Sequence, residues 1–210
     1  MSISRKAFLG LGVATVASCA LGGVAWASAP EDGLLRPPVV DDDLAFASRC
    51  LRCYRCVEAC HTRAIVPAPL EKGIVSWSTP TLDFHRGPCD FCDECVRVCP
   101  TGALRSCDPE APDQGRIGVA VVQPDRCIAY EYGCDICEVA CPYQAITLRD
   151  GGIPYVDDAK CNGCGECEYQ CPALVYRSFS GGTRRGIVVE TEAVAFRSKE
   201  EEGERYGEGD

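Results

Sequence analysis

Apolar residues occur in one long run near the start of this chain and later only in short stretches. The long run covers residues 7–27 and follows the basic pair Arg5-Lys6. Residues 145–148 and 153–156 are short β-prone segments separated by an Asp-Gly-Gly turn, a pattern typical of a β-hairpin. Residues 118–122 are a third apolar segment of strand length. These segments predict a small set of short strands.

After the first run, the sequence shows no sustained helical periodicity. Residues 96–98 and 138–140 are long enough for one helical turn each. Alternation of strand, loop and short helix predicts a small, loop-rich α+β body. The 210 residues include 18 Cys but only 8 Tyr, 6 Phe, 2 Trp and 1 Met. Something other than hydrophobic burial must therefore help to hold the body together.

Residues 1–27 have the organisation of an export signal. A short basic start precedes the apolar run, which ends at the small-residue site Ala25-Trp26-Ala27. The stretch from Ser4 to Leu9 resembles a twin-arginine signal, although Lys6 stands where the second Arg is expected. The alternative is an uncleaved membrane anchor, because the run is just long enough to span a bilayer. Residues 28–43, rich in Pro and Asp, are predicted to be a linker.

The strongest pattern is a fourfold repeat of C-x2-C-x3-C, each preceded by one more Cys. That extra Cys lies three residues upstream in the first, second and fourth repeats and seven upstream in the third. A tight turn with Cys at every third position directs three thiolates at one cubane cluster, while the last Cys ligates a neighbouring cluster. The pattern predicts four 4Fe-4S clusters. The predicted ligands are Cys50, Cys53, Cys56, Cys60, Cys89, Cys92, Cys95, Cys99, Cys127, Cys134, Cys137, Cys141, Cys161, Cys164, Cys167 and Cys171.

Zinc sites and disulfides are the competing interpretations of these cysteines. Structural zinc usually takes two separate CxxC pairs, and a disulfide scaffold has no reason to repeat one spacing four times. The spacing therefore favours iron–sulfur clusters. Cys107 falls outside the repeats and is predicted to be a spare thiol. His61 stands where Pro follows the last Cys of the other repeats; we keep Cys60 as a ligand and interpret His61 as a local polar contact.

Charge and composition exclude several classes of function. The chain has 21 basic and 31 acidic residues, and without residues 1–27 the net charge becomes −12, which argues against nucleic-acid binding. The chain has only two histidines, His61 and His85, and no nicotinamide or flavin motif. No catalytic residue is therefore predicted, nor a cofactor beyond the clusters. Residues 179–210 are predicted to form a strand followed by an acidic disordered tail.

Several segments resemble the NapG/MauM ferredoxin-type proteins, which are associated with periplasmic nitrate reductase and methylamine oxidation systems. The similar segments include Leu35-Arg36-Pro37-Pro38, Ala45-Phe46-Ala47-Ser48 and the stretch from Gly115 to Val121. The wide gap between Cys127 and Cys134 is also similar to the third motif of that family. The resemblance covers residues 4 to about 178.

The resemblance implies two bacterial-type dicluster ferredoxin modules within a four-cluster domain, residues 44–178. In related four-cluster subunits the first motif pairs with the fourth and the second with the third; pairing of consecutive motifs is the alternative.

The family also implies export of the cluster-loaded protein to the periplasm or the outer face of the cytoplasmic membrane. There it would transfer electrons from a membrane quinol-oxidising partner or its cytochrome to a periplasmic oxidoreductase of anaerobic respiration. The alternatives are an accessory or maturation protein of such a reductase and an iron–sulfur subunit of a molybdenum-type reductase. An electron-transfer subunit fits the sequence better than an independent enzyme.

Overall fold

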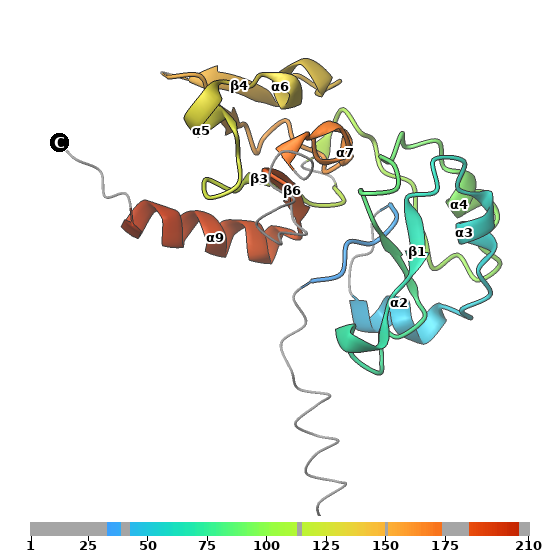
Figure 1. Ribbon diagram of the computed structural model, residues 1–210. Coiled ribbons are helices and arrows are strands. Elements are labelled where there is room, and N and C mark those ends of the chain that lie inside the picture. The colour runs from blue at the N-terminus through green and yellow to red at the C-terminus, as the bar shows by residue number, and fades with distance from the viewer. Residues whose placement is uncertain (1–32, 39–42, 113–114, 150, 174–184, 206–210) are drawn as a thin grey trace, which may run out of the picture.

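Three two-stranded antiparallel sheets carry the strands of the computed structural model, which describes residues 33–38, 43–112, 115–149, 151–173 and 185–205 (Figure 1). The pairs are β1 (Ile65–Pro67) with β2 (Pro80–Leu82), β3 (Val119–Val122) with β6 (Ile187–Glu190), and β4 (Ile146–Arg149) with β5 (Ile153–Val156). Figure 1 shows β1 on one side of the molecule and β4 on the other. The described chain therefore has an N-terminal half and a C-terminal half.

The predicted hairpin is confirmed. Strands β4 and β5 pair from Ile146↔Val156 to Arg149↔Ile153, around the expected turn. The predicted strand at residues 118–122 is β3, but its partner is distant in sequence: Val119 pairs with Glu190 and Val122 with Ile187. The pairing of β3 with β6 therefore joins two segments that lie far apart in the sequence.

Four short helices each contain the third cysteine of a motif. These are α3 (Arg55–Ala59), α4 (Glu94–Arg97), α6 (Ile136–Ala140) and α7 (Glu166–Gln170). Left-handed residues precede three of them: Tyr54 with φ 61°, Asp93 with φ 58° and Gly165 with φ 79°. These residues reverse the chain direction and let the cysteines on either side face the same space. Helix α3 packs on α4, and α6 packs on α7.

The remaining helical segments lie around these motifs. They are α2 (Asp43–Arg49), the 3₁₀ turn η1 (Leu70–Lys72), α5 (Ala129–Tyr132) and α9 (Glu192–Arg205). Within the described parts of the chain, no helix has both the length and the apolar composition needed to cross a bilayer. The predicted signal, residues 1–27, lies outside the described residues.

Structured segments lie on both sides of the predicted four-cluster domain, residues 44–178. The predicted strand after residue 179 is β6, and within the predicted tail the described residues Glu192–Arg205 form helix α9. Ala195 of this helix is buried and α9 packs on β3, so tertiary contacts stabilise a segment already rich in helix-forming residues. Strand β6 and helix α9 therefore pack against the strand that precedes the third motif.

The predicted linker also contains a structured segment. Leu34, Arg36, Pro37 and Pro38 are buried, and the Leu35 carbonyl accepts a hydrogen bond from the Leu82 N–H at 2.8 Å. Segment 33–38 is thus part of the body and lies beside β2.

Arg36 is the polar centre of this segment. One terminal nitrogen donates to Thr79 Oγ1 at 2.6 Å and to the Pro80 carbonyl at 2.9 Å, and the guanidinium lies 4.9 Å from the centre of the Phe46 ring. These contacts offset the cost of burying the charge.

Arg36→Met should lower the free energy of unfolding by about 3 kcal/mol, because it leaves buried acceptors without their charged donor. Urea unfolding of the anaerobic protein, followed by circular dichroism, measures this. Arg86→Met removes an exposed Arg that pairs with Asp83, so this control should change stability by less than ~1 kcal/mol. Equal midpoints for the two variants would contradict a structural role for Arg36.

Candidate metal centres

Cysteines of the first motif converge with the last cysteine of the second. Cys50, Cys53, Cys56 and Cys99 line one cavity. Burial raises the pKa of Cys56 to about 11, and the nearby Cys50 and Cys53 add to the rise. Burial also acts on Cys99, but hydrogen bonds from backbone N–H groups, including that of Leu104, outweigh it and lower the pKa. Such donors stabilise thiolate charge.

A second cavity gathers the other cysteines of these two motifs. Cys60, Cys89, Cys92 and Cys95 line it together. Burial raises the pKa of both Cys89 and Cys95 to about 12, and Cys60 contributes to each rise through its charge. The last cysteine of the first motif therefore lies with the second motif.

The C-terminal half repeats this exchange. Cys161, Cys164 and Cys167 share a cavity with Cys141, the last cysteine of the third motif. Burial raises the pKa of Cys164 to about 12 and that of Cys167 well above its usual range, and Cys141 adds to both rises.

The fourth group surrounds Cys137. Burial raises the pKa of Cys137 to about 12, and the charges of the nearby Cys127, Cys134 and Cys171 add to the rise. Helix α5 occupies the wide gap between Cys127 and Cys134, so the longer spacing still brings both thiols to Cys137.

The cysteine groups show which motifs are partners. The first motif exchanges its last cysteine with the second, and the third with the fourth. The pairing of first with fourth and second with third is therefore wrong, and the alternative of consecutive pairing describes this chain. The physical reason is the packing of α3 on α4 and of α6 on α7.

The chemistry of these groups fits iron–sulfur clusters. Each gathers four thiols in a partly buried space. In every group at least one thiol has a raised pKa, because burial and neighbouring thiolates disfavour the thiolate form that binds metal; these thiols are Cys56, Cys89, Cys95, Cys137, Cys164 and Cys167. A cationic iron–sulfur core would offset both effects. None of the seventeen described cysteines forms a disulfide. Cys107, half-buried, lines none of the three cavities given above.

The two halves meet between the second and fourth motifs. The backbone N–H of Cys89 donates to the Cys164 carbonyl at 2.8 Å. Nearby, the rings of Phe91 and Tyr143 meet edge to face, with centroids 6.2 Å apart. Burial raises the pKa of Tyr143, and the charges of Cys164 and Cys89 add to it. The cysteine groups thus follow the spatial order first, second, fourth, third, which no sequence spacing indicates.

Gly165 permits a second close contact between the halves. Its φ of 79° and the adjacent Phe84 ring both require glycine, since a Cβ there would lie 2.1 Å from Phe84 Cδ1.

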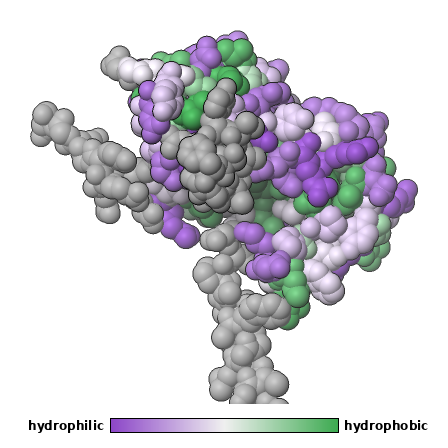
Figure 2. Space-filling view, viewed as in Figure 1, coloured by the Kyte–Doolittle hydropathy of each residue, from purple (hydrophilic) through white to green (hydrophobic). Residues whose placement is uncertain are grey.

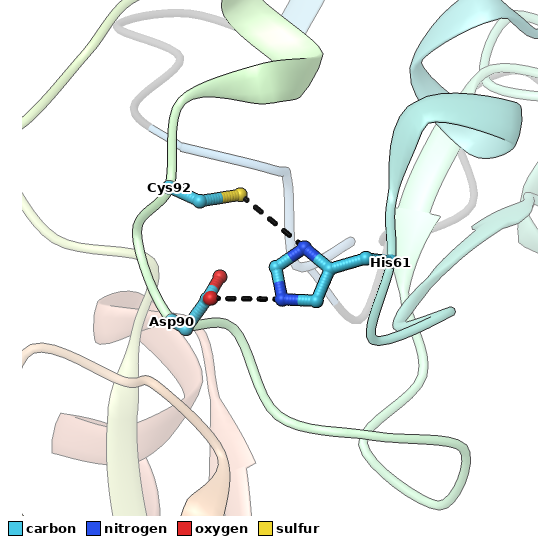
Figure 3. A group of neighbouring side chains, drawn as sticks. All are labelled: His61, Asp90 and Cys92. Atoms are coloured by element: carbon cyan, nitrogen blue, oxygen red, sulfur yellow. Dashed lines mark hydrogen bonds and ion pairs between the residues drawn. The ribbon is translucent and has the colours of Figure 1, made fainter.

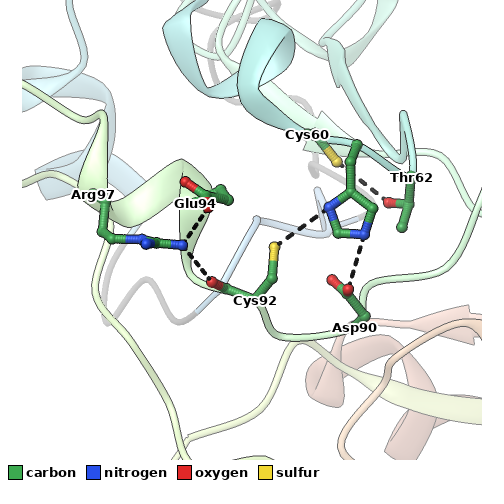
Figure 4. A network of polar contacts seen from close by, with 7 residues as sticks. Cys60, Thr62, Asp90, Cys92, Glu94 and Arg97 are labelled. Carbon is green, nitrogen blue, oxygen red and sulfur yellow. Dashed lines mark hydrogen bonds and ion pairs between the residues drawn. The ribbon is translucent and has the colours of Figure 1, made fainter.

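His61 makes polar contacts beside the second cysteine group. Its Nε2 lies 2.9 Å from Asp90 Oδ2, and its Nδ1 lies 3.8 Å from Cys92 Sγ (Figure 3). Figure 4 adds a hydrogen bond between Cys60 Sγ and Thr62 Oγ1 at 3.3 Å. The donor atoms of His61, Asp90 and Cys92 lie within 4.8 Å of one another and are exposed, but Cys92 also lines the second cysteine cavity. We therefore interpret His61 as a polar neighbour of that group.

His85 lies near a buried carboxylate. Its Nε2 is 3.6 Å from Glu168 Oε1, and its pKa is lowered by partial burial and by the charge of Arg185. Glu168 is buried and accepts a hydrogen bond from the Val189 N–H at 2.7 Å. These contacts connect α7 to β6 and to the loop before the second motif.

Comparisons with known proteins agree with this chemistry. The family described as the 4Fe-4S dicluster domain matches residues 49–103, 88–145 and 126–175. Each match spans two successive motifs, so the matches alone do not choose between pairings. The chain is 37% identical over 188 residues to the ferredoxin-type protein NapG of Escherichia coli (strain K12), covering 80% of each chain.

Two other relatives share the similarity. The methylamine utilization ferredoxin-type protein MauM of Methylophilus methylotrophus is 37% identical over 193 residues, covering 80% of each chain. The ferredoxin-type protein NapF of Escherichia coli (strain K12) is 33% identical over 144 residues, which is 66% of this chain and 80% of the relative.

Proposed function

We propose, from the premise that this chain belongs to the family of NapG and MauM ferredoxin-type proteins, that it carries electrons through four 4Fe-4S clusters in two dicluster modules. The family implies iron–sulfur electron transfer. The number of clusters rests on one observation: each of the four motifs gives its last cysteine to a neighbour and receives one in return.

The proposed ligand sets follow these groups. In the N-terminal module they are Cys50, Cys53, Cys56 with Cys99, and Cys89, Cys92, Cys95 with Cys60. In the C-terminal module they are Cys127, Cys134, Cys137 with Cys171, and Cys161, Cys164, Cys167 with Cys141.

The chain's own residues would set the properties of each centre. A bound cluster supplies one-electron chemistry at a potential that depends on hydrogen bonds to sulfur, charge and exposure. The Ala145 N–H donates to Cys141 Sγ at 3.3 Å, and the Ala120 N–H donates to Cys161 Sγ at 3.4 Å. Apolar burial limits solvent at the same positions. These residues hold thiolates and exclude water, and no described residue needs to act as a catalytic acid or base.

The proposed partners lie on either side of an electron path in the periplasm or at the outer face of the cytoplasmic membrane. A membrane quinol-oxidising protein or its cytochrome would supply electrons, and a periplasmic oxidoreductase would take them. The twin-arginine-like start supports export after cluster insertion, because clusters assembled in a reducing cytoplasm would already occupy the thiols. The contact between Cys89 and Cys164 supports electron passage between modules at the second and fourth motifs.

Anaerobic purification followed by assays of iron and acid-labile sulfide tests this proposal. We expect about sixteen iron per chain, and magnetically coupled S = 1/2 signals in low-temperature EPR of the dithionite-reduced protein. Zinc in place of iron, or no metal in the folded protein, would contradict electron transfer.

A further inference from the structure

Several large apolar side chains are exposed beside the first cysteine motif. Leu51 and Trp77 are 68% and 53% exposed, and Ile74 and Val75 are also exposed. We call this surface, together with Arg49, Arg52, Tyr54 and Arg55, the first-motif face. Figure 2 shows apolar surface on this N-terminal half among polar residues. Monomeric proteins rarely leave such clusters uncovered, and they commonly mark interaction sites.

Hydrogen bonds join the two loops that make the first-motif face. Arg52 Nε donates to the Trp77 carbonyl at 3.0 Å, and Arg52 Nη2 donates to the Val75 carbonyl at 2.8 Å. The hydroxyl of Tyr54 contacts that of Ser78. The face is therefore held in shape before any partner binds, which reduces the entropic cost of docking.

The first-motif face covers the cysteine group of the first motif, which lies at one end of the spatial order of the four groups. Leu51, Tyr54 and Arg55 line the cavity that contains Cys50, Cys53, Cys56 and Cys99, and Cys53 itself is exposed. In the spatial order first, second, fourth, third, this group is terminal. An electron that enters or leaves at this end would cross the first-motif face.

The charge of the face is opposite to that of the whole protein. The chain has a net charge of −10, yet residues 49–58 contain three exposed arginines and one glutamate. The other terminal group has a different surface: Tyr132 and Val139 are exposed beside the exposed acids Glu131 and Asp135. The two ends of the proposed path therefore present different charges to partners.

We propose that the first-motif face docks an acidic electron-transfer protein whose own contact surface is apolar at its centre. Arg and aromatic side chains are the residues that dominate such interfaces, and complementary charge sets orientation and association rate. The proposal rests on the electron-transfer function above and names the partner chemistry at one end of it.

Stopped-flow reduction of the full-length, cluster-loaded protein by a reduced plant-type 2Fe-2S ferredoxin, a small acidic donor, tests the docking. Both proteins are acidic, so repulsion between whole molecules predicts a faster reaction at higher salt. Docking at a basic face predicts a slower one as the Debye length shortens from about 10 Å at 0.1 M toward 3 Å at 1 M. We expect the slower reaction.

Two variants locate the site. Arg49→Glu should slow reduction by ferredoxin about threefold at low salt, and it leaves the loop hydrogen bonds of Arg52 in place. Ile74→Ser/Trp77→Ser should also slow it, through lost apolar contact. The matched variant Tyr132→Ser/Val139→Ser, at the other end, should react as the wild type does. Iron content and reduction by methyl viologen radical should be unchanged in all three.

The outcomes separate docking from function. A purified protein without clusters would contradict the proposed electron-transfer function itself. Clusters that viologen reduces, with ferredoxin rates insensitive to the face variants or rising with salt, would overturn only the docking proposal. Slower hydrogen exchange of residues 70–78 on anionic phospholipid vesicles, with unchanged ferredoxin rates, would also overturn it and identify a lipid-facing surface instead.

Discussion

Cys99→Ser should remove the cluster of the first motif, although Cys99 belongs to the second motif in sequence. Its thiol shares a cavity with Cys50, Cys53 and Cys56, and a serine hydroxyl is a much poorer ligand for iron–sulfur clusters than a thiolate. The reciprocal variant, Cys60→Ser, should remove the cluster of the second motif. Each variant should contain about twelve iron instead of sixteen.

EPR of the reduced variants measures which cluster is lost. The signal missing from Cys99→Ser should match that missing from Cys53→Ser, and the signal missing from Cys60→Ser should match that missing from Cys92→Ser. Cys107→Ser is the control and should retain all of its iron. Loss of the same signal in Cys99→Ser and Cys92→Ser would contradict the exchange of cysteines between motifs.

Removal of the iron should unfold the cluster domain. Cysteines from all four motifs belong to the core or pack against it, alongside a limited set of larger side chains that includes Phe46 and Phe84. Each cluster would connect two motifs, and a typical domain is stable by only about 5–15 kcal/mol. Loss of four such connections should exceed that margin. After anaerobic chelation, we expect far-UV circular dichroism to lose its cooperative urea transition.

Acid should have a similar effect. Raised thiol pKa values, to about 12 at Cys95 and Cys137, mean that protons compete with iron for these ligands, so cluster affinity falls as pH falls. Iron release on stepwise acidification should therefore coincide with unfolding. In the chelation experiment, a metal-free chain that still unfolds cooperatively at the same urea concentration would contradict the prediction, because packing alone would then be sufficient to stabilise the fold.

Local features of the fold could be predicted from the sequence, because the residues within each short segment determine them. The β4–β5 hairpin follows from two β-prone segments around an Asp-Gly-Gly turn, and the strand β3 from a short apolar segment. The repeated spacing also identifies the cysteines that form the groups, and in each motif a helix of four or five residues contains the third cysteine and ends before the fourth.

Long-range features were not accessible, because nothing local encodes them. The cysteine group that Cys60 or Cys99 joins depends on which helices pack together, and identical spacings are compatible with either pairing of the motifs. Pairing of β6 with β3 and burial of Arg36 depend on contacts between segments far apart in the chain. In α9, the acidic composition predicts disorder, but burial of Ala195 adds a stabilisation that composition does not reveal.

The exchange of last cysteines also has a consequence for biogenesis. On a ribosome, the first two proposed sites become complete only when Cys95 and Cys99 have been synthesised, and the last two only with Cys167 and Cys171. Strand β6, which closes the sheet with β3, is made later still. A nascent chain therefore presents incomplete thiol sets for most of its synthesis, and cluster insertion into the C-terminal half must await nearly the whole polypeptide. An export route that accepts only folded cargo would then act as a checkpoint for cluster loading.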